Sequence, residues 1–356
     1  MLQLMLGTNW RTNRDRILDL LAQDVSRKAG GRILLVPEQA SHDYERRLCA
    51  RAGDTASRYG EVLSFTRLAG RVFAQMGGGA EPVLDGGGRL LAMAAAVEKL
   101  RPRLKAYAAV GTRPEFLSAL VTAVDEFKSC CVTREALQAA ARQSEGILAE
   151  KLEELSLLLE AYDGICAGFG QDPRDRMTKL LEQMEAGSFA REHVFYIDGF
   201  SDFTAQELAV LAHLIEESPS VTVSLVCDGP GSQTPGMELA GETAGTLLRL
   251  ASQAGIPAQE QGLRDPDVGT PWGNMRRTLL WGPLEPIPGL ADYARAARLE
   301  TVRQECVFVA AELRRRARAG VWPWYAGISH GMSRFCARFW AGTGFPPTLP
   351  DLRIFF

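Results

Sequence analysis

Five short runs of β-forming residues constrain the fold of this chain more than any other feature of its sequence. Each run is largely apolar without strict alternation, and each is bounded by Gly, Pro or Asp. A strand that is apolar on both faces is buried on both faces, which is typical of a parallel sheet covered by helices. The runs are Met1 to Leu6, Arg32 to Val36, Val62 to Ser64, His193 to Ile197 and Val221 to Val226.

Helical patterns separate these predicted strands. They cover Ile17 to Lys28, Tyr44 to Ala52, Arg67 to Met76 and Gln206 to Glu217. The spacing of Thr204 and Glu207 predicts a capping box just before the apolar stripe of the last helix. The alternation of strands and helices predicts an α/β fold with a doubly wound parallel sheet and right-handed crossovers.

The alternation stops between about residues 81 and 187, where the pattern is purely helical. Helices are predicted over Leu90 to Leu100, over Thr112 to Cys130 with a capping box from Thr112 to Glu115, along a stripe from Leu152 to Cys166, and from Asp172 with Pro173 in first position. A helical domain inserted between the third and fourth strands is the simplest arrangement. We therefore predict one α/β domain, residues 1–80 and 188–290, split by a helical insertion, residues 81–187.

The C-terminal third of the sequence is less regular. Gly229 to about Pro288 is rich in Gly, Pro and Gln, with one helix predicted over Thr243 to Ala254. Glu300 to Arg318 is predicted to form a strand and then a helix, which makes residues 291–320 the start of a second α/β domain. Residues 321–356 follow neither period and hold three of the six tryptophans. We expect an aberrant or unstructured tail produced by an interrupted reading frame, with an unusual but genuine terminus as the alternative.

Composition excludes several classes of protein. The net charge of −3 creates no global field toward nucleic acid, so any such contact must come from a local basic groove. The seven cysteines are scattered, without CxxC spacing or a nearby histidine, which predicts reduced, mostly buried thiols and no metal site. Neither a signal peptide nor an apolar run of about 18 residues is present, and we expect a cytoplasmic protein.

The first predicted strand ends in a turn that is placed like a phosphate-binding loop but lacks its ligands. Counting GxxxxGK[ST] from Gly7 puts Thr12 at the second glycine, Asn13 at the lysine and Arg14 at the magnesium-binding hydroxyl. Without that lysine and hydroxyl, the loop loses the charge that holds the β- and γ-phosphates and the ligand that holds the metal. Two interpretations stay open: backbone amides of Gly7 to Asn13 cradle a phosphate at a helix start, or the turn is a relic.

Six segments spread over residues 1 to about 230 share a further property. They are MLQLMLG (1–7), ILLVPEQAS (33–41), VLSFTRLAGRVF (62–73), LDGGGRLL (84–91), EKLEELSLLLEAYD (150–163) and FYIDGFSDFTAQELAVL (195–211). In this order they resemble the N-terminal part of the AddB family, the B subunit of AddAB-type helicase-nucleases. The resemblance implies a bacterial complex with an A subunit that resects double-strand DNA ends for recombinational repair.

The same resemblance implies an architecture and a set of cofactors. The sheet is expected to be a P-loop, RecA-like domain of the superfamily 1 helicase type with an inserted helical subdomain, and Arg303 to Arg316 resembles the start of a second such domain. The family implies ATP and Mg²⁺ in the complex, and a nuclease domain with a 4Fe-4S cluster beyond the end of this chain. No cluster cysteine or nuclease carboxylate is assigned here, so we expect no cofactor in this chain.

By the same resemblance, Asp198 ends the fourth strand where a helicase has its magnesium-binding aspartate. Gly199 follows where the helicase has the glutamate that activates water. The alternative is that Asp198 caps the turn from Gly199 to Thr204.

Four residues after the third strand match the position of a helicase motif that contacts DNA: Ser64, Phe65, Thr66 and Arg67. The resemblance implies phosphate contacts from the hydroxyl and guanidinium groups and base stacking on Phe65. The alternative places Phe65 in the core and Arg67 in solvent. Gln39, with its neighbours Pro37 and Glu38 at the end of the second strand, is a weaker candidate for the same role.

These observations support three hypotheses. The first is a truncated, catalytically silent fragment of a helicase-nuclease B subunit, which acts as a DNA-binding scaffold beside an active motor subunit and has a degenerate nucleotide site and no nuclease domain. The alternative is an active P-loop ATPase or DNA helicase with an unorthodox phosphate loop. The third is a nonfunctional, poorly folded product.

Overall fold

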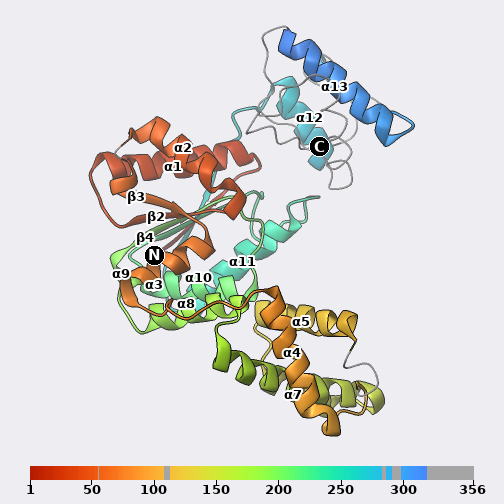
Figure 1. Ribbon diagram of the computed structural model, residues 1–356. Coiled ribbons are helices and arrows are strands. Elements are labelled where there is room, and N and C mark those ends of the chain that lie inside the picture. Colours follow the sequence, from red (N-terminus) through yellow and green to blue (C-terminus); the bar gives the residue numbers. More distant parts are fainter. Residues whose placement is uncertain (55, 108–112, 283–285, 291–297, 319–356) are drawn as a thin grey trace. The chain divides into compact units, whose positions relative to one another are not determined.

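The computed structural model describes residues 1–54, 56–107, 113–282, 286–290 and 298–318, and Figure 1 shows their course. The chain divides into two compact units, Met1–Glu285 and Pro286–Phe356. The first unit holds the sheet and all but one of the α-helices in the described residues. Among these residues, no helix combines the length and apolarity needed to cross a membrane.

Six parallel strands form one sheet in the order β3-β2-β4-β5-β1-β6. The five predicted strands and their parallel pairing are confirmed, for example with Leu4 opposite Val223 and Leu34 opposite Tyr196. The sixth strand was not predicted, because its sequence AQEQG is polar and mostly exposed at the sheet edge, where it pairs only with β1. The strands are β1 Leu2–Leu6, β2 Arg32–Leu35, β3 Gly60–Leu63, β4 Val194–Ile197, β5 Val221–Leu225 and β6 Ala258–Gly262.

Helices cover both faces of this sheet, as Figure 1 shows. On one face, Met5, Leu34 and Tyr196 pack against α1 (Trp10–Ser26) and α2 (Ser41–Ala52). On the other face, Leu4 and Phe195 pack against α3 (Phe65–Met76), α8 (Arg176–Glu185), α9 (Phe189–Glu192), α10 (Ala205–Glu217) and α11 (Glu238–Gln253). Burial on two faces explains why the strands are apolar without alternation.

The predicted start of the first helix is wrong by seven residues. The helix α1 begins at Trp10 and not at Ile17, because Asn9 caps it: the Asn9 side chain accepts a hydrogen bond from the backbone N–H of Arg11. The first turn of α1 is stabilised by this cap and has no apolar stripe of its own, so the apolar pattern indicated only the later part of the helix. The capping box of α10 is confirmed, with Thr204 and Glu207 exchanging side-chain and backbone hydrogen bonds.

Between β3 and β4 the chain is helical. The helices α4 (Gly86–Leu100), α5 (Pro114–Ser129), α6 (Arg134–Gln143) and α7 (Gly146–Phe169) pack around their own apolar core, centred on the fully buried Tyr162. Within the predicted insertion, residues 81–187, Leu180 and Met184 of α8 pack in the core of the sheet and not in this helical core.

Helix starts in this stretch differ in detail from the predictions. Thr112, the predicted cap of α5, lies outside the described residues, and Arg113 precedes the helix without a side-chain cap. Asp172 accepts a hydrogen bond from the backbone of Arg174 and starts a 3₁₀ turn, η4 (Pro173–Asp175), before α8. Other 3₁₀ turns are η1 (Glu38–Ala40), η2 (Ala56–Arg58) and η3 (Arg101–Arg103). Two cysteines expected among mostly buried thiols, Cys130 and Cys131, are exposed after α5.

In the described residues, two helices follow β6. In the first unit, α12 (Pro271–Trp281) was not predicted; Thr270 caps it by accepting from the backbone of Gly273. In the second unit, α13 covers Val302–Arg318, so the strand predicted within Glu300 to Arg318 is wrong for the described residues. The backbone of Gln304 donates to the Thr301 hydroxyl, which starts a helix where a strand was expected. The predicted aberrant tail, residues 321–356, lies outside the described part of the chain.

Candidate functional site

The carboxyl ends of the parallel strands meet at one edge of the sheet, and the predicted site residues lie there. Gly7 follows β1, Gln39 lies in η1 after β2, Ser64 follows β3 and Asp198 follows β4. Open α/β sheets bind ligands outside this edge, where the helices after neighbouring strands cover opposite faces. The neighbours β1 and β5 form such a place, because α1 covers one face and α11 the other.

The side chain of Asn13, the residue aligned with the phosphate-binding lysine, closes the turn after β1. Its Nδ2 donates to the backbone oxygen of Leu225 at the end of β5, at 2.8 Å, and the side chain is fully buried. A Cβ atom on Gly7 would collide with Oδ1 of Asn13, so glycine is required there while Asn13 keeps this position. The turn consists of Gly7 to Asn9 only, and Thr12 is already inside α1.

The guanidinium group of Arg14, next to Asn13, contacts other side chains of α1. Arg14 is nearly buried, pairs with the adjacent Asp15 at 3.0 Å, and lies over the ring of Trp10 at 4.9 Å from its centroid. Arg14 therefore stands where the motif has a small hydroxyl, and its charge is held by neighbours on the same helix.

Two carboxylates from the segment after β6 lie at the amino end of α1. The Nδ2 of Asn9 donates to Asp265 at 3.0 Å and to Asp267 at 3.1 Å. Arg276 of α12 pairs with both carboxylates. A helix start attracts negative charge, which is why such positions bind phosphate in other proteins. Here the chain supplies its own anions, and no local sequence signal linked them to Asn9.

Asp198 is buried at the end of β4. The Tyr44 hydroxyl of α2 donates to its Oδ2 at 2.8 Å, and the side chain is 3% exposed. Burial raises the pKa of Asp198 to about 6, although hydrogen bonds from Tyr44 and from the backbone of Gly199 and the charge of Arg14 act in the opposite direction. Burial also raises the pKa of the Tyr44 hydroxyl, and the neighbouring Asp198 adds to that effect. The capping alternative is consistent with the Gly199 contact.

Ser64 and Phe65 are buried and perform structural tasks. The Ser64 hydroxyl caps α3 by accepting from the backbone of Arg67 at 3.2 Å and also bonds the carboxylate of Glu38. The Phe65 ring packs edge-on against Phe200 at 5.7 Å between centroids and belongs to the core of the sheet. Of the two roles considered for Phe65, the structure shows the core position, and base stacking by this ring stays a prediction.

Three of the five residues proposed to contact DNA are exposed: Gln39, Thr66 and Arg67. Arg67 forms an ion pair with Glu45 of α2 at 2.8 Å, with both side chains about half exposed. An exposed pair of this kind exchanges partners at little cost, so the guanidinium can turn to a phosphate. The sheet edge thus divides into a closed part around β1, β4 and β5 and an accessible part after β2 and β3.

The residues at the closed part do not fit a magnesium nucleotide. Asn13 stands at the lysine position and Arg14 at the position of the metal-binding hydroxyl, and the inward-facing Asn13 fills the space beside Gly7. The Oδ1 of Asn13 is buried without a hydrogen-bond partner in the described residues, so it is an acceptor that repels phosphate oxygens. No group of three or more His, Cys, Asp or Glu side chains in the described residues is arranged to hold a metal ion.

Comparison with known proteins identifies a family. The sequence model described as "ADDB, N-terminal" matches residues 5–270. Similar relatives are proteins named as the B subunit of an ATP-dependent helicase/deoxyribonuclease, from Desulforudis audaxviator, 30% identical over 305 residues, and from Pelotomaculum thermopropionicum, 34% identical over 237 residues. The aligned parts cover 82% and 64% of this chain but only 26% and 20% of the respective relatives, so the chain matches about a fifth to a quarter of their length.

Proposed function

The chain belongs to the family described as ADDB, N-terminal, and from this membership we propose that it works within the B subunit of a helicase-nuclease that processes double-strand DNA ends for recombinational repair. In this proposal it is a DNA-binding scaffold and not a motor. Its relatives are named as the B subunit of an ATP-dependent helicase/deoxyribonuclease. From these names we propose DNA as the substrate and an A subunit as the partner.

We assign the parallel sheet to the P-loop, RecA-like class of superfamily 1 helicases, with α4 to α7 as an inserted subdomain. Two features support this assignment: the strand, turn and helix at the first strand, and the separate apolar core of the helices between β3 and β4. The helix α13 is proposed to begin a second domain of the same class.

The observation that carries the non-motor role is the position of Asn13. A motor of this class needs a lysine on the β- and γ-phosphates and a hydroxyl on the metal. Here the aligned side chain is short, uncharged and hydrogen-bonded to Leu225. The carboxylates of Asp265 and Asp267 at the start of α1 would also repel a triphosphate. We propose that no nucleotide or metal cofactor binds in the described part of this chain.

The proposed DNA contact is the accessible part of the sheet edge, with Gln39, Thr66 and Arg67. An amide, a hydroxyl and a guanidinium suit phosphate oxygens, which hold DNA without reading its sequence. Since the chain has a net charge of −3, this contact depends on local groups and is sensitive to salt.

Two titrations test the proposal. The first follows the anisotropy of a labelled duplex with a single-stranded end, at several salt concentrations. Replacing Arg67 by Gln is expected to weaken binding and to reduce the slope of log K against log salt by about 1. The matched control is Arg134→Gln, because Arg134 also sits in an exposed ion pair, with Glu160, but lies on α6 away from the edge. Equal loss in both variants would contradict the assigned DNA contact.

The second titration uses a fluorescent ATP analogue with Mg²⁺, together with an assay for released phosphate. The scaffold role predicts neither saturable binding nor hydrolysis. Magnesium-dependent hydrolysis that disappears in an Asp198→Asn variant would instead establish the alternative, an active ATPase with an unorthodox loop.

A further inference from the structure

The helical bundle α4 to α7 and the sheet have separate apolar cores that share no member among the described residues. The chain passes between them twice, before α4 and after α7. These two connecting segments lie side by side, since the backbone of Leu84 donates to Gln171 at 2.9 Å and that of Gln171 to Pro82 at 2.7 Å. The first segment starts at Gly77 and Gly78, which have φ angles of 90° and 101°. Such a pair of short connections allows rotation of one core relative to the other.

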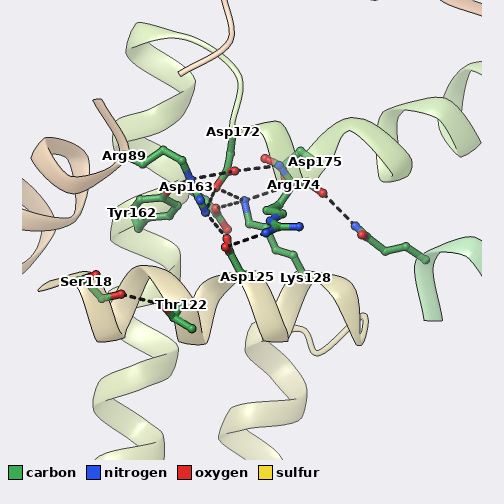
Figure 2. Close-up of polar contacts among 11 residues, drawn as sticks. Arg89, Ser118, Thr122, Asp125, Lys128, Tyr162, Asp163, Asp172, Arg174 and Asp175 are labelled. Atoms are coloured by element: carbon green, nitrogen blue, oxygen red, sulfur yellow. Dashed lines mark hydrogen bonds and ion pairs between the residues drawn. The ribbon is translucent and has the colours of Figure 1, made fainter. Parts of the chain in front are cut away.

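A cluster of charged side chains lies where the second connection leaves the bundle, and Figure 2 shows it. Its centre is Asp172, which is 1% exposed and accepts hydrogen bonds from the Tyr162 hydroxyl at 2.9 Å and from Arg89 and Lys128 at 3.3 Å each. Asp125 bonds Arg89 as well. These contacts join α4, α5 and α7 to one buried carboxylate. The cluster, which we call the charged joint, consists of Arg89, Asp125, Lys128, Tyr162, Asp163, Asp172, Arg174 and Asp175.

The joint continues outward from the bundle through η4. Arg174 pairs with Asp125 at 3.1 Å, and Asp175 pairs with Lys128 at 2.7 Å. On the far side, Nε2 of Gln206 in α10 donates to the backbone oxygen of Arg174 and to the hydroxyl of Thr178, both at 3.1 Å. A continuous set of polar contacts therefore runs from the bundle through η4 to a helix that packs on the sheet.

The inner and outer contacts of the joint differ in exposure. The side chains of Arg89 and Asp172 are 9% and 0% exposed, so salt screens their attraction only weakly. The side chains of Arg174 and Asp175 are 50% and 36% exposed, so their attractions are weak and are easily screened. The inner contacts hold the bundle together, whereas the two outer ion pairs, each with one more exposed partner, are the ones that salt weakens.

We propose that the outer part of the charged joint is a conformational lock. Asp175, Arg174 and Gln206 fix the bundle in one orientation relative to the sheet, and the bundle turns as a unit about the paired connections when the ion pairs are screened or when either the ion pairs or the Gln206 hydrogen bonds are removed. This inference goes beyond the proposed function and does not depend on DNA or nucleotide binding.

The test measures the distance between the two parts in the full chain. Nitroxide labels are placed on p-acetylphenylalanine at Gln23 of α1 and Ile147 of α7, both exposed, which leaves the native cysteines untouched. Double electron–electron resonance of the otherwise unchanged protein at low salt is expected to give one narrow distance distribution. In each of the variants Asp175→Asn and Gln206→Leu, the distance distribution is expected to lose its single narrow peak. The same loss is expected for the unchanged protein in about 1 M NaCl, where the Debye length is about 3 Å and ion pairs are screened.

The matched control is Glu160→Gln, which breaks the exposed ion pair with Arg134 between α6 and α7 inside the bundle. It is expected to leave the distribution unchanged. A broad distribution in the unchanged joint at low salt, or a narrow one that survives both variants and high salt, would overturn the proposal. If a joint variant fails to give the circular dichroism of a folded chain, the salt series on the unchanged joint decides alone.

Discussion

Replacing Asp198 by Asn is expected to stabilise the protein at neutral pH. The carboxyl group is almost completely buried, and its pKa is raised from 3.8 to about 6. At pH 7.5 the folded chain must therefore hold a buried charge, whereas the unfolded chain holds the same charge in water. One pKa unit corresponds to about 1.4 kcal/mol, so holding the charge costs roughly 3 kcal/mol of the free energy of unfolding. An amide of the same shape avoids most of this cost.

The sign of the pH dependence follows from the same shift. Because the pKa is higher in the folded chain, the stability that the neutral carboxyl contributes is complete below about pH 4 and is lost as the pH rises through 6. The difference in unfolding free energy between Asp198→Asn and the unchanged chain should therefore be small near pH 4 and grow to a plateau above pH 6.

Urea unfolding at pH 4.5 and 7.5, followed by tryptophan fluorescence, measures this difference. Asp202→Asn is the matched control, because Asp202 lies four residues away on the same loop and is exposed. If Asp198→Asn is less stable than the unchanged chain at pH 7.5, the ionised carboxylate stabilises the fold, and the argument from burial is refuted.

Three further predictions concern single contacts. Gly7→Ala should destabilise by about 1 to 3 kcal/mol through collision with Asn13, and a double-mutant cycle with Asn13→Ala should show strong coupling; additive effects would contradict the collision. Glu154→Gln should lower the free energy of unfolding in urea by about 2 to 3 kcal/mol, because the buried carboxylate accepts hydrogen bonds from the backbone N–H groups of residues 105–107. The control, Glu153→Gln at an exposed position, should leave the free energy of unfolding unchanged. Cys131→Gly should raise the melting temperature, because the φ angle of 54° at Cys131 strains a residue with a Cβ atom by about 1 kcal/mol and glycine adopts it freely. An unchanged melting temperature would show that the backbone at this position is unstrained.

The sequence predicted the sheet well because its signals are local. Continuous apolar runs identified five strands, and the capping box at Thr204 identified the start of α10 correctly. Prediction from the sequence failed for elements whose local signals are weak. The strand β6 is polar because only its backbone pairs with the sheet, and α1 starts at a capped turn without apolar periodicity.

The candidate site was predicted only as a set of positions. That Asn13 replaces the lysine is visible in the sequence, but its inward hydrogen bond to Leu225, 212 residues away, is not. The same holds for Asp265 beside Asn9, and for the burial of Phe65 against Phe200. Each of these contacts depends on which strands and loops the topology makes neighbours.

The amino-acid sequence by itself determined the class of fold and the absence of a phosphate-binding lysine, because both depend on residue type and on spacing within a few turns of chain. The tertiary structure decided which parts of the sheet edge are closed and which are accessible. It also brought the charged joint together from four segments. These features arise from contacts between residues far apart in the chain, whose geometry is fixed only when the strands are ordered and the helices are packed.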